Sequence, residues 1–356
     1  MWQSGDKVSL MRVLSIVGAR PQFVKLAPIS WSSQGVLDHF ILHTGQHYDY
    51  DLSEQFFKDL NLGKPDWNLQ VGSGMHGVQT GKMLIGIEKI LSDNEFDHII
   101  VYGDTNTTLA GAIVAAKLNI PVSHVEAGLR SFNRRMPEEL NRIIADHASN
   151  LLFAPTKNAM ENLKKEGLID KSKLVGDITL ETLETIVQLD RGTSKDSDKT
   201  EFIYATIHRA QNTDDRKRLA KLLGRFERSL IPVHLHCHPR LRKSIESLGL
   251  DRNLKNTTLF PPLSFIESIR AINNAAGVIT DSGGLQKEAY ILKKPCLIAR
   301  FETEWTETIH PGGNRLDPEL AAVSTEWWND DQSQKPDLFG DGATSKSVIA
   351  EILNYV

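Results

Sequence analysis

The chain has 356 residues, of which 40% are hydrophobic and 24% are charged, and its formal net charge is −4. This length favours two domains of about 100–200 residues each, and the slightly acidic balance argues against nucleic acid as a partner. No apolar run approaches the roughly 20 residues that span a bilayer, so no membrane association is predicted. The two cysteines give no disulfide framework, and residues 1–10 lack the apolar core of a signal peptide. We therefore expect a cytoplasmic protein with a short leader.

Strand and helix patterns alternate through residues 12–175. Short apolar runs rich in β-branched residues predict strands, and amphipathic or Ala-rich segments between them predict helices. The predicted strands are 12–17, 40–44, 68–71, 99–102, 121–125, 151–154 and 173–175. Helices are predicted from Phe23 onward and at 52–60, 77–91, 109–118, 138–149 and 156–167. This alternation is typical of a doubly wound parallel sheet with helices on both faces.

A second alternating series follows a polar segment at 190–199, which we interpret as a linker or a surface loop near one. Its predicted strands are 202–206, 233–236, 257–260, 277–280 and 295–299, with a helix at 285–292 and a last helix at 346–356. The predicted fold class is therefore α/β, with two doubly wound domains. We place these domains at 1–185 and 186–342, and expect residues 343–356 to pack back on the first domain.

Acidic residues follow two consecutive strands of the first domain. Asp104 comes shortly after one strand, Glu126 directly after the next, and Glu138 follows an intervening loop. The carboxyl ends of parallel strands line the ligand crevice of such sheets, where close carboxylates can act as proton donor and acceptor. Each residue also has a structural interpretation. These are a helix cap for Asp104, an ion pair with Arg130 for Glu126, and an acid at a helix N-terminus for Glu138.

The first strand leads into a glycine turn at 18–21 and then into a helix. This layout presents backbone N–H groups to a phosphate, and Arg20 and Lys25 add cations beside it. The turn lacks the GxGxxG pattern, so it does not indicate a dinucleotide site. Surface charge at the start of a helix explains the same residues equally well.

A second glycine turn, DSGG at 281–284, lies between strand 277–280 and a helix. Its glycines allow close approach to the backbone, the Ser282 hydroxyl can donate, and the helix dipole favours an anion. This pattern predicts the phosphate site of the second domain, although a plain helix start is the alternative. Glu288, one turn further on, is placed to accept hydroxyls of a ribose.

Histidines suggest two further sites. His208 follows the first strand of the second domain, where it could neutralise or protonate a leaving diphosphate, or simply cap or pack. His234, His236 and His238 alternate along a strand and would point the same way, as in a metal site. Zinc sites usually draw their ligands from separated segments, and no matching CxxC or HxxxH occurs elsewhere, so no metal is predicted.

Eight motifs, in order along nearly the whole chain, resemble those of the non-hydrolysing UDP-N-acetylglucosamine 2-epimerase family. They are GARPQFVK (18–25), TGQH (44–47), GDTNTTLA (103–110), HVEAGLR (124–130), PEELNR (137–142), IHRAQN (207–212), TDSGGLQKEA (280–289) and GDG (340–342). The resemblance implies two Rossmann-like domains that face each other across a cleft, the glycosyltransferase-B arrangement. It also implies reversible inversion at C2 of a UDP-sugar without NAD or metal, in which UDP is eliminated to a bound glycal and adds back. A homodimer and a role in polysaccharide biosynthesis are expected on the same ground.

The resemblance assigns roles to the residues that match the family motifs. Asp104, Glu126 and Glu138 match its essential acids, and which acid acts on which face of the sugar stays open. His208 matches its essential histidine, expected on the diphosphate. The remaining matches are expected to bind UDP or substrate: Arg20 and Lys25 of the cationic loop, Leu263 of the uridine-side loop 261–265, and Ser282, Gly283, Gly284 and Glu288 of the nucleotide-binding turn.

The sequence also departs from the family pattern. Trp305 stands where the best-known members have Arg, and Phe301 replaces a usual acid. Tyr48 and Asp49 stand where substrate-activated bacterial members carry Arg and Gln. The TEW and HRAQNTDD patterns resemble the branch that acts on UDP-2,3-diacetamido-2,3-dideoxy-glucuronic acid, so the choice between this substrate and UDP-N-acetylglucosamine stays open. Alternatives to the reaction are a hydrolysing epimerase, a glycosyltransferase of the same fold and a non-catalytic nucleotide-sugar binder.

Overall fold

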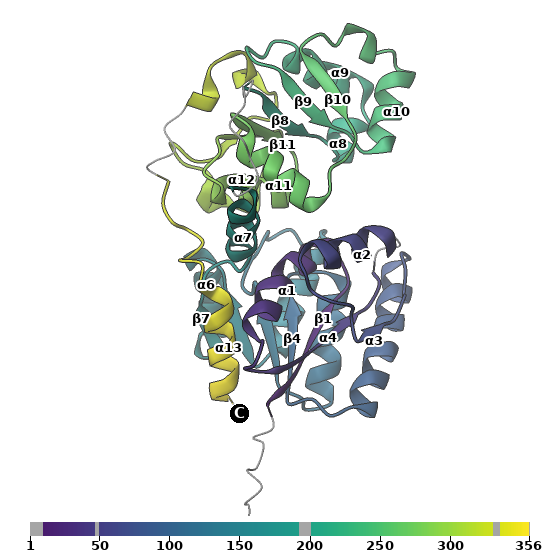
Figure 1. Ribbon diagram of the computed structural model, residues 1–356, viewed down its shortest axis with the longest axis vertical. Coiled ribbons are helices and arrows are strands. Elements are labelled where there is room, and N and C mark those ends of the chain that lie inside the picture. Colours follow the sequence, from purple (N-terminus) through teal and green to yellow (C-terminus); the bar gives the residue numbers. More distant parts are fainter. Residues whose placement is uncertain (1–9, 47–49, 192–200, 330–334, 356) are drawn as a thin grey trace, which may run out of the picture. The chain divides into compact units, whose positions relative to one another are not determined.

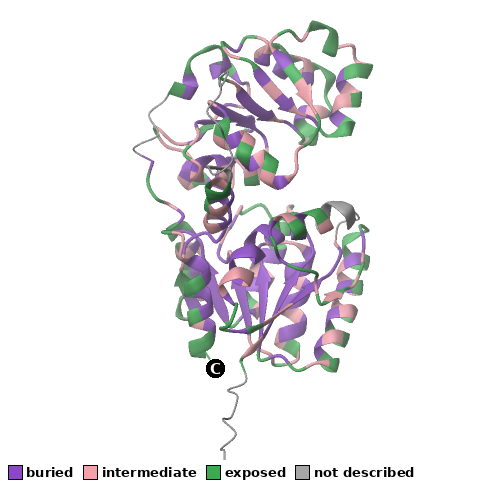
Figure 2. Ribbon diagram, in the orientation of Figure 1, coloured by how far each residue is buried: buried purple, intermediate pink, exposed green. Residues whose placement is uncertain are grey.

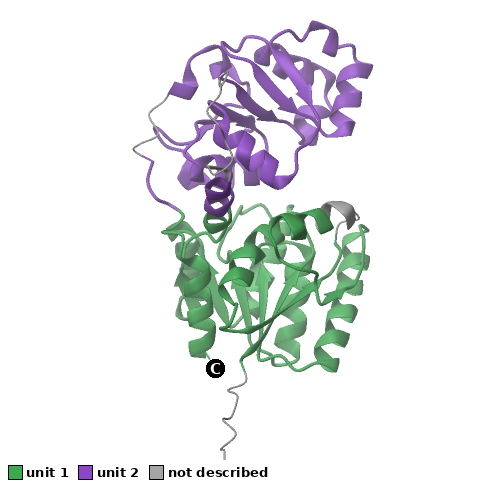
Figure 3. Cartoon of the chain, in the orientation of Figure 1, with its two compact units in different colours: residues 1–182, 339–356 green, residues 183–338 purple. Residues whose placement is uncertain are grey.

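The computed structural model describes residues 10–46, 50–191, 201–329 and 335–355. The chain divides into two compact units, which are residues 1–182 with 339–356 (unit 1) and residues 183–338 (unit 2) (Figure 3). Each unit holds one parallel sheet with helices on its faces (Figure 1), which confirms the predicted α/β class. Most of the predicted linker, residues 192–199, lies outside the described residues. Among the residues described, no helix combines the length and the apolar character needed to cross a membrane.

Unit 1 is built on a seven-stranded parallel sheet with the order β3-β2-β1-β4-β5-β6-β7. Its strands are β1 (Arg12–Val17), β2 (Asp38–His43), β3 (Trp67–Asn68), β4 (His98–Tyr102), β5 (Val122–Val125), β6 (Leu151–Ala154) and β7 (Ser172–Leu174). β1 pairs with β2 on one side and with β4 on the other, so the strand order reverses there. Ligands of doubly wound sheets bind at the carboxyl ends of the strands beside such a reversal. The loops after β1 and β4 therefore lie at the expected site.

The helices of unit 1 cover both faces of this sheet. They are α1 (Arg20–Ser32), α2 (Tyr50–Asp59), α3 (His76–Asp93), α4 (Asn106–Lys117), α5 (Pro137–Ala148), α6 (Lys157–Lys165), the 3₁₀ turn η1 (Ile169–Lys171) and the last helix, α13 (Thr344–Tyr355). Helix α7 (Thr179–Arg191), which was not predicted from the sequence, runs from unit 1 into unit 2. α13 packs against α1, and Ser345 at its start donates its amide to Glu181.

The central strands are buried because helices lie on both sides of them (Figure 2). All five residues of β4 are buried, which explains its continuous apolar run. Helix α4 packs closely on this strand, since a Cβ at Gly111 would lie 2.8 Å from Val101 Cγ1. α4 begins at Asn106, one turn before the predicted Leu109, because Thr105 Oγ1 caps the amide of Thr108. The helix N-terminus therefore stands directly at the end of β4.

Unit 2 has a six-stranded parallel sheet with the order β10-β9-β8-β11-β12-β13. Its strands are β8 (Ile203–Thr206), β9 (Val233–His236), β10 (Thr257–Phe260), β11 (Gly277–Thr280), β12 (Cys296–Ile298) and the unpredicted β13 (Arg315–Leu316). Its helices are α8 (Ala210–Thr213), α9 (Arg216–Phe226), α10 (Pro239–Ser247), α11 (Phe265–Asn274) and α12 (Gly283–Ile291). Short 3₁₀ turns are η2 (Asp251–Asn253), η3 (Thr306–Thr308), η4 (Ala321–Ser324) and η5 (Trp327–Asn329). The strand order reverses between β8 and β11, so the loops after these two strands are the counterparts of the unit 1 loops.

Candidate functional site

In unit 1 the turn after β1 is closed by its own helix. Gln22 Oε1 accepts hydrogen bonds from the amides of Gly18 (2.8 Å) and Ala19 (3.1 Å), and Gln22 Nε2 donates to Tyr102 O (2.9 Å). Helix α1 therefore begins at Arg20 instead of the predicted Phe23. Because the protein satisfies these two amides itself, they do not face a phosphate in this structure. Arg20 is exposed at the first position of the helix.

A buried ion pair joins α1 to the loop after β5. Lys25 Nζ lies 2.8 Å from Glu126 Oε1, and both side chains are less than 10% exposed. Glu126 has φ +71°, a left-handed conformation that non-glycine residues adopt mainly where surrounding contacts hold them. Gly103 is close to this pair, since a Cβ there would lie 3.2 Å from Lys25 Nζ and 3.7 Å from Glu126 Oε1. The alternative interpretation of Glu126, an ion pair with Arg130, is wrong, because Arg130 instead binds Asp146 of α5 and Glu166, the C-cap of α6.

Asp104 binds an arginine from α5. Its carboxylate lies 2.5 Å from Arg142 Nη2, and its side chain is 31% exposed. Its backbone carbonyl accepts a hydrogen bond from Asn141 Nδ2 at 2.9 Å. The residue that caps α4 is Thr105, so the interpretation of Asp104 as a helix cap is wrong. Asp104 is thus anchored to α5 at a position that solvent still reaches.

The two glutamates at the start of α5 have different surroundings. Glu139 is buried and accepts hydrogen bonds from the amides of Ser131 (2.8 Å) and Phe132 (2.9 Å) and from Arg142 Nη1 (3.0 Å). Burial alone would raise the pKa of Glu139, but these donors outweigh it and hold the pKa below its ordinary value. Glu138 is exposed in the first helical turn, as its interpretation as a helix N-terminal acid requires. Glu139 thus fixes the preceding loop, and Glu138 faces solvent.

Unit 1 therefore brings Lys25, Asp104 and Glu126 to one edge of its sheet, around Gly103. Arg142 is a further charged residue of this site that the sequence analysis did not single out. Its spacing of three residues from Glu139 on one helix face is the signal that could have identified it. The predicted motif residues at 47–49, including Tyr48 and Asp49, lie outside the described residues.

In unit 2 a buried aspartate organises the loop after β8. Asp281 is 0% exposed and accepts hydrogen bonds from the amides of His208 (3.1 Å) and Arg209 (3.0 Å) and from Asn212 Nδ2 (2.9 Å). His208 Nδ1 lies 3.1 Å from Asp281 Oδ1, while the His208 side chain is 54% exposed. Burial would raise the pKa of Asp281, but His208 and the other donors lower it below its ordinary value. His208 is therefore neither packed in the core nor the cap of a helix.

The turn between β11 and α12 is occupied partly by the protein's own groups. Ser282 Oγ accepts a hydrogen bond from Leu285 N (3.3 Å), so α12 begins at Gly283, two residues before the prediction. A Cβ at Gly283 would lie 2.0 Å from Glu304 Oε1, and Glu304 in turn pairs with buried Arg300 at 2.9 Å. The glycine is thus needed for the approach of this carboxylate. The sequence analysis did not single out Glu304.

The other predicted residues of unit 2 surround this turn or precede α11. Gly284 is exposed, and Glu288 is partly buried one turn further along α12. A Cβ at Gly284 would lie 3.8 Å from Glu288 Oε1, so the two residues are neighbours. Leu263 is partly buried in the loop after β10.

The three alternating histidines pack against other groups. His234 stacks on Phe202 with ring centroids 4.3 Å apart, and His236 stacks on Tyr204 at 4.9 Å. His238 Nδ1 accepts a hydrogen bond from Arg240 N and so caps α10. Across the described part of the chain, no three His, Cys, Asp or Glu side chains are grouped to hold a metal ion.

The chain is similar to known proteins over nearly its whole length. Residues 31–353 match the sequence model of a family described as UDP-N-acetylglucosamine 2-epimerase. A UDP-N-acetylglucosamine 2-epimerase homolog of Methanococcus maripaludis is 43% identical, with 97% of this chain and 100% of the relative covered. The UDP-2,3-diacetamido-2,3-dideoxy-D-glucuronate 2-epimerase of Pseudomonas aeruginosa is 44% identical over 86% of this chain and 88% of the relative. The crystal structure of the Methanocaldococcus jannaschii UDP-GlcNAc 2-epimerase in complex with UDP-GlcNAc and UDP is 38% identical, with a TM-score of 0.84, and 97% and 100% of the two chains covered.

Proposed function

The chain belongs to the UDP-N-acetylglucosamine 2-epimerase family, and we propose that it is an isomerase that reversibly inverts C2 of a UDP-2-acetamido sugar. One observation carries the proposal. Two carboxylates, Asp104 and Glu126, stand at adjacent strand ends of unit 1, each beside its own cation, Arg142 or Lys25. Inversion at carbon needs one group to remove a proton and another to deliver it, and carboxylates in different surroundings can divide these roles.

The reaction that suits these groups is elimination followed by addition. A base removes the C2 proton, the C1–O bond breaks with its electron pair on UDP, and a C1–C2 double bond forms. UDP then attacks C1 again while an acid delivers a proton to the opposite face of C2. No net oxidation or reduction occurs, so the sequence of steps needs no hydride carrier.

We assign proton transfer to Asp104, Glu126 and Glu138, without allotting each acid to a face of the sugar. His208 is proposed to contact the diphosphate, because its ring is half exposed and anchored through Nδ1. Arg20, Lys25 and the turn of Ser282, Gly283, Gly284 and Glu288 are proposed to bind the UDP-sugar, with Leu263 on the uridine side. A diphosphate arriving at Gly283 would compete with the Glu304 carboxylate for the same space.

Two substrates stay in competition, UDP-N-acetylglucosamine and UDP-2,3-diacetamido-2,3-dideoxy-glucuronic acid. Trp305, which replaces the family's usual Arg, is 5% exposed and lies 4.8 Å from Lys287 Nζ in a cation–π contact. The substitution therefore removes a cation and adds a buried aromatic group. The P. aeruginosa relative, named for the diacetamido uronate, supports testing that substrate beside UDP-N-acetylglucosamine.

Proton NMR of each UDP-sugar incubated with the protein in D₂O tests the proposal. We expect the C2 epimer to appear with deuterium at C2 while UDP stays attached. Free N-acetylmannosamine would identify the hydrolysing reaction instead, and UDP release that depends on an added acceptor would identify a glycosyltransferase. No change with either sugar nucleotide would contradict the proposed function.

We also propose that the protein is a cytoplasmic homodimer. Met75, Val78 and Ile85 place large apolar side chains on the solvent side of α3 and its N-cap, with exposed fractions of 77%, 50% and 72%. Large exposed apolar side chains spaced three and seven residues apart along one helix favour an interface. Light scattering coupled to size-exclusion chromatography should give a dimer mass for the natural protein and a monomer mass for Ile85→Glu. A monomeric natural protein would contradict the proposal.

A further inference from the structure

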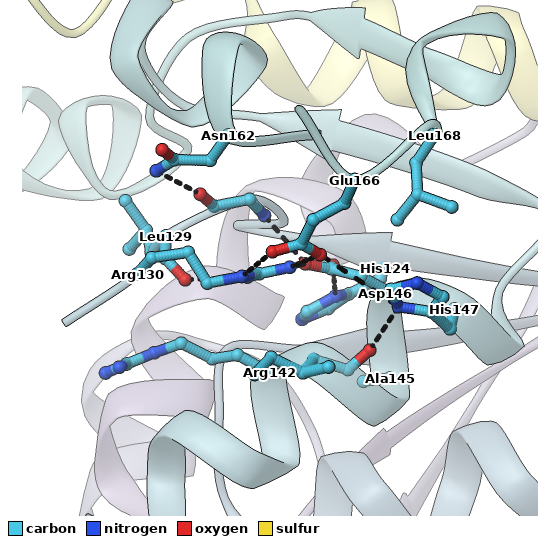
Figure 4. A network of polar contacts seen from close by, with 12 residues as sticks. His124, Leu129, Arg130, Arg142, Ala145, Asp146, His147, Asn162, Glu166 and Leu168 are labelled. Carbon is cyan, nitrogen blue, oxygen red and sulfur yellow. Dashed lines mark hydrogen bonds and ion pairs between the residues drawn. The ribbon is translucent and has the colours of Figure 1, made fainter. Parts of the chain in front are cut away.

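His124, which lies on β5 two residues before Glu126, belongs to a buried polar network in unit 1 (Figure 4). Its side chain is 0% exposed. Its Nδ1 lies 2.6 Å from Asp146 Oδ1 on α5, and its Nε2 lies 2.6 Å from the carbonyl oxygen of Gly103. One ring thus spans from α5 to the loop after β4.

Both ring nitrogens of His124 must carry a proton in this arrangement. The Gly103 carbonyl can only accept a hydrogen bond, so Nε2 donates to it. Asp146 already accepts hydrogen bonds on Oδ2 from the Gly128 amide (3.1 Å) and from Arg130 Nη2 (2.7 Å). Burial would raise the pKa of Asp146, but His124 and Arg130 outweigh it and hold the pKa below its ordinary value. A carboxylate therefore faces Nδ1, which must also donate.

The charges of the network balance. Arg130 forms a two-pronged contact with Glu166 of α6, with Nε–Oε1 and Nη2–Oε2 distances of 2.7 Å. With both ring nitrogens of His124 protonated, two cations, His124 and Arg130, face two carboxylates, Asp146 and Glu166. Other charged groups stand at the border, where Lys171 Nζ donates to the Asp146 carbonyl oxygen (3.0 Å) and the half-exposed His147 lies 4.0 Å from Glu166.

The backbone groups that the network holds flank the two acids of the proposed site. Gly103 precedes Asp104, and Gly128 follows Glu126 by two residues. Gly103 (φ +62°) and Glu126 (φ +71°) are both left-handed, and the Gly103 amide donates to Val125 O at 3.0 Å. Glycine adopts this conformation freely, whereas Glu126 keeps it only where its surroundings determine it strongly. The His124 ring fixes the carbonyl of Gly103, directly before Asp104.

We propose that His124 is a positioning residue for the epimerisation, present as an imidazolium that ties the Asp104 loop to α5 and the Glu126 loop. This inference rests on the proposed function for its effect on rate, but not for the charge of the ring. A neutral imidazole would leave one of its two acceptors without a proton, and a buried unpaired acceptor is costly. His124 itself exchanges no proton with substrate, because both of its nitrogens are occupied.

Nitrogen-15 NMR of the histidine side chains tests the charge directly. His98 is a matched internal control, because it is also 0% exposed, lies on the adjacent β4, and has a pKa lowered by burial to about 4. At pH 7.5 we expect His124 to show two protonated ring nitrogens and His98 to show one. A His124 ring with one bare nitrogen would overturn the proposal, whether or not the protein epimerises any sugar.

Kinetics of His124→Gln and His124→Asn test the positioning role. Misplacing reacting groups by about 1 Å can cost about 100-fold in rate, so we expect kcat to fall by about that factor. KM and the affinity for UDP should change less than threefold, because the ring contacts no ligand. Asp146→Asn should share this pattern, while His147→Gln, at the adjacent position, should keep the natural kcat. Unchanged kcat in the His124 variants would overturn the positioning role, whereas inactivity of the natural protein would overturn only the proposed function.

Discussion

Each unit pairs a buried aspartate with a histidine near the carboxyl edge of its sheet, and the two histidines differ in what they leave available. In unit 1 His124 is fully buried, and both of its nitrogens are bound, to Asp146 and to Gly103 O. In unit 2 His208 is 54% exposed and binds Asp281 through Nδ1. Within the described part of the chain, its Nε2 makes no hydrogen bond or ion pair.

The aspartate–histidine pair therefore has a different role in each unit. A histidine whose two ring nitrogens are both hydrogen-bonded can hold the backbone in place but cannot contact a ligand. A histidine anchored through Nδ1 alone presents its other nitrogen in a fixed direction, as an anion-binding or proton-donating group must. The acids differ in the same way, since Asp104 and Glu126 pair with side-chain cations, while Asp281 accepts hydrogen bonds from backbone amides of the loop after β8. We therefore expect proton transfer to depend on unit 1 and diphosphate binding on unit 2.

The largest effect should come from the acids of unit 1. Glu126→Gln and Asp104→Asn keep the shape of each side chain and remove its ability to carry a proton. General acid–base groups contribute about 100- to 10,000-fold, so we expect kcat to fall by about 1,000-fold. The measurement is the rate of deuterium incorporation at C2 of the UDP-sugar in D₂O.

The division between the units also predicts what these variants keep. UDP affinity, measured by calorimetry, should stay within about threefold of the natural value, because both variants change groups of unit 1 while the diphosphate is assigned to unit 2. Glu88→Gln, on the exposed side of α3, is a charge-matched control expected to retain full activity. If Glu126→Gln strongly weakened UDP binding but left the isotope exchange rate at saturating substrate unchanged, the assignment of roles to the two units would be reversed.

The next effect concerns stability in unit 2. Asp281→Asn leaves four donors around a group that can no longer accept from all of them, which should cost about 3 kcal/mol in unfolding free energy. Because the folded state lowers the pKa of Asp281, its contribution is present above the ordinary aspartate pKa and is lost as the pH falls through the folded value. The stability difference between the natural protein and Asp281→Asn, measured by urea unfolding, should therefore shrink in acid. A difference that grew on acidification would contradict this assignment.

The sequence predicted the sheets well, because their strands are buried on both faces and read as apolar runs. β1, β6, β9, β10 and β11 have the predicted bounds. The starts of α1 and α4 were missed by one turn, since Gln22 and Thr105 cap these helices and side-chain capping is a three-dimensional contact. α7 and the two-residue β13 were missed because neither has a long apolar pattern.

The sequence predicted where the site lies, but not which side chains form ion pairs within it. The ends of β4 and β5 indicated the positions of Asp104 and Glu126, because ligands bind at the carboxyl ends of strands near a reversal of strand order. Their partners come from helices whose approach the sequence does not encode locally. Lys25 therefore appeared as a possible phosphate ligand, and Arg142 was not singled out. His124 begins the motif HVEAGLR but was assigned no role, since its role depends on contacts with Gly103 O and Asp146, which are distant in sequence.

A smaller effect is expected when the exposed Nε2 of His208, in unit 2, is removed. His208→Asn can retain a donor near the Nδ1 position, and so the anchor to Asp281, while it removes Nε2. We expect kcat/KM to fall about 100-fold with little change in melting temperature, because the lost group serves the reaction and not the fold. His238→Asn is the matched control, since His238 caps α10 and asparagine is a favourable cap. Equal losses in both variants would show that His208 acts only through folding.

The smallest effect distinguishes His98, a buried neutral histidine, from the charged His124. Burial lowers the pKa of His98 to about 4, and its Nε2 lies 2.6 Å from Ser123 Oγ. The unfolded chain therefore binds a proton at higher pH than the folded one, so stability is complete above about pH 6.5 and falls as the pH drops toward 4. Linkage gives a loss of about 2 kcal/mol between pH 7.5 and 5 from this residue. His98→Gln should flatten the pH dependence of the unfolding free energy by that amount, whereas His124→Gln, which removes a group already charged in the folded state, should not. If both variants flattened the curve equally, His124 would be a neutral core histidine and the contrast between the two units would rest on exposure alone.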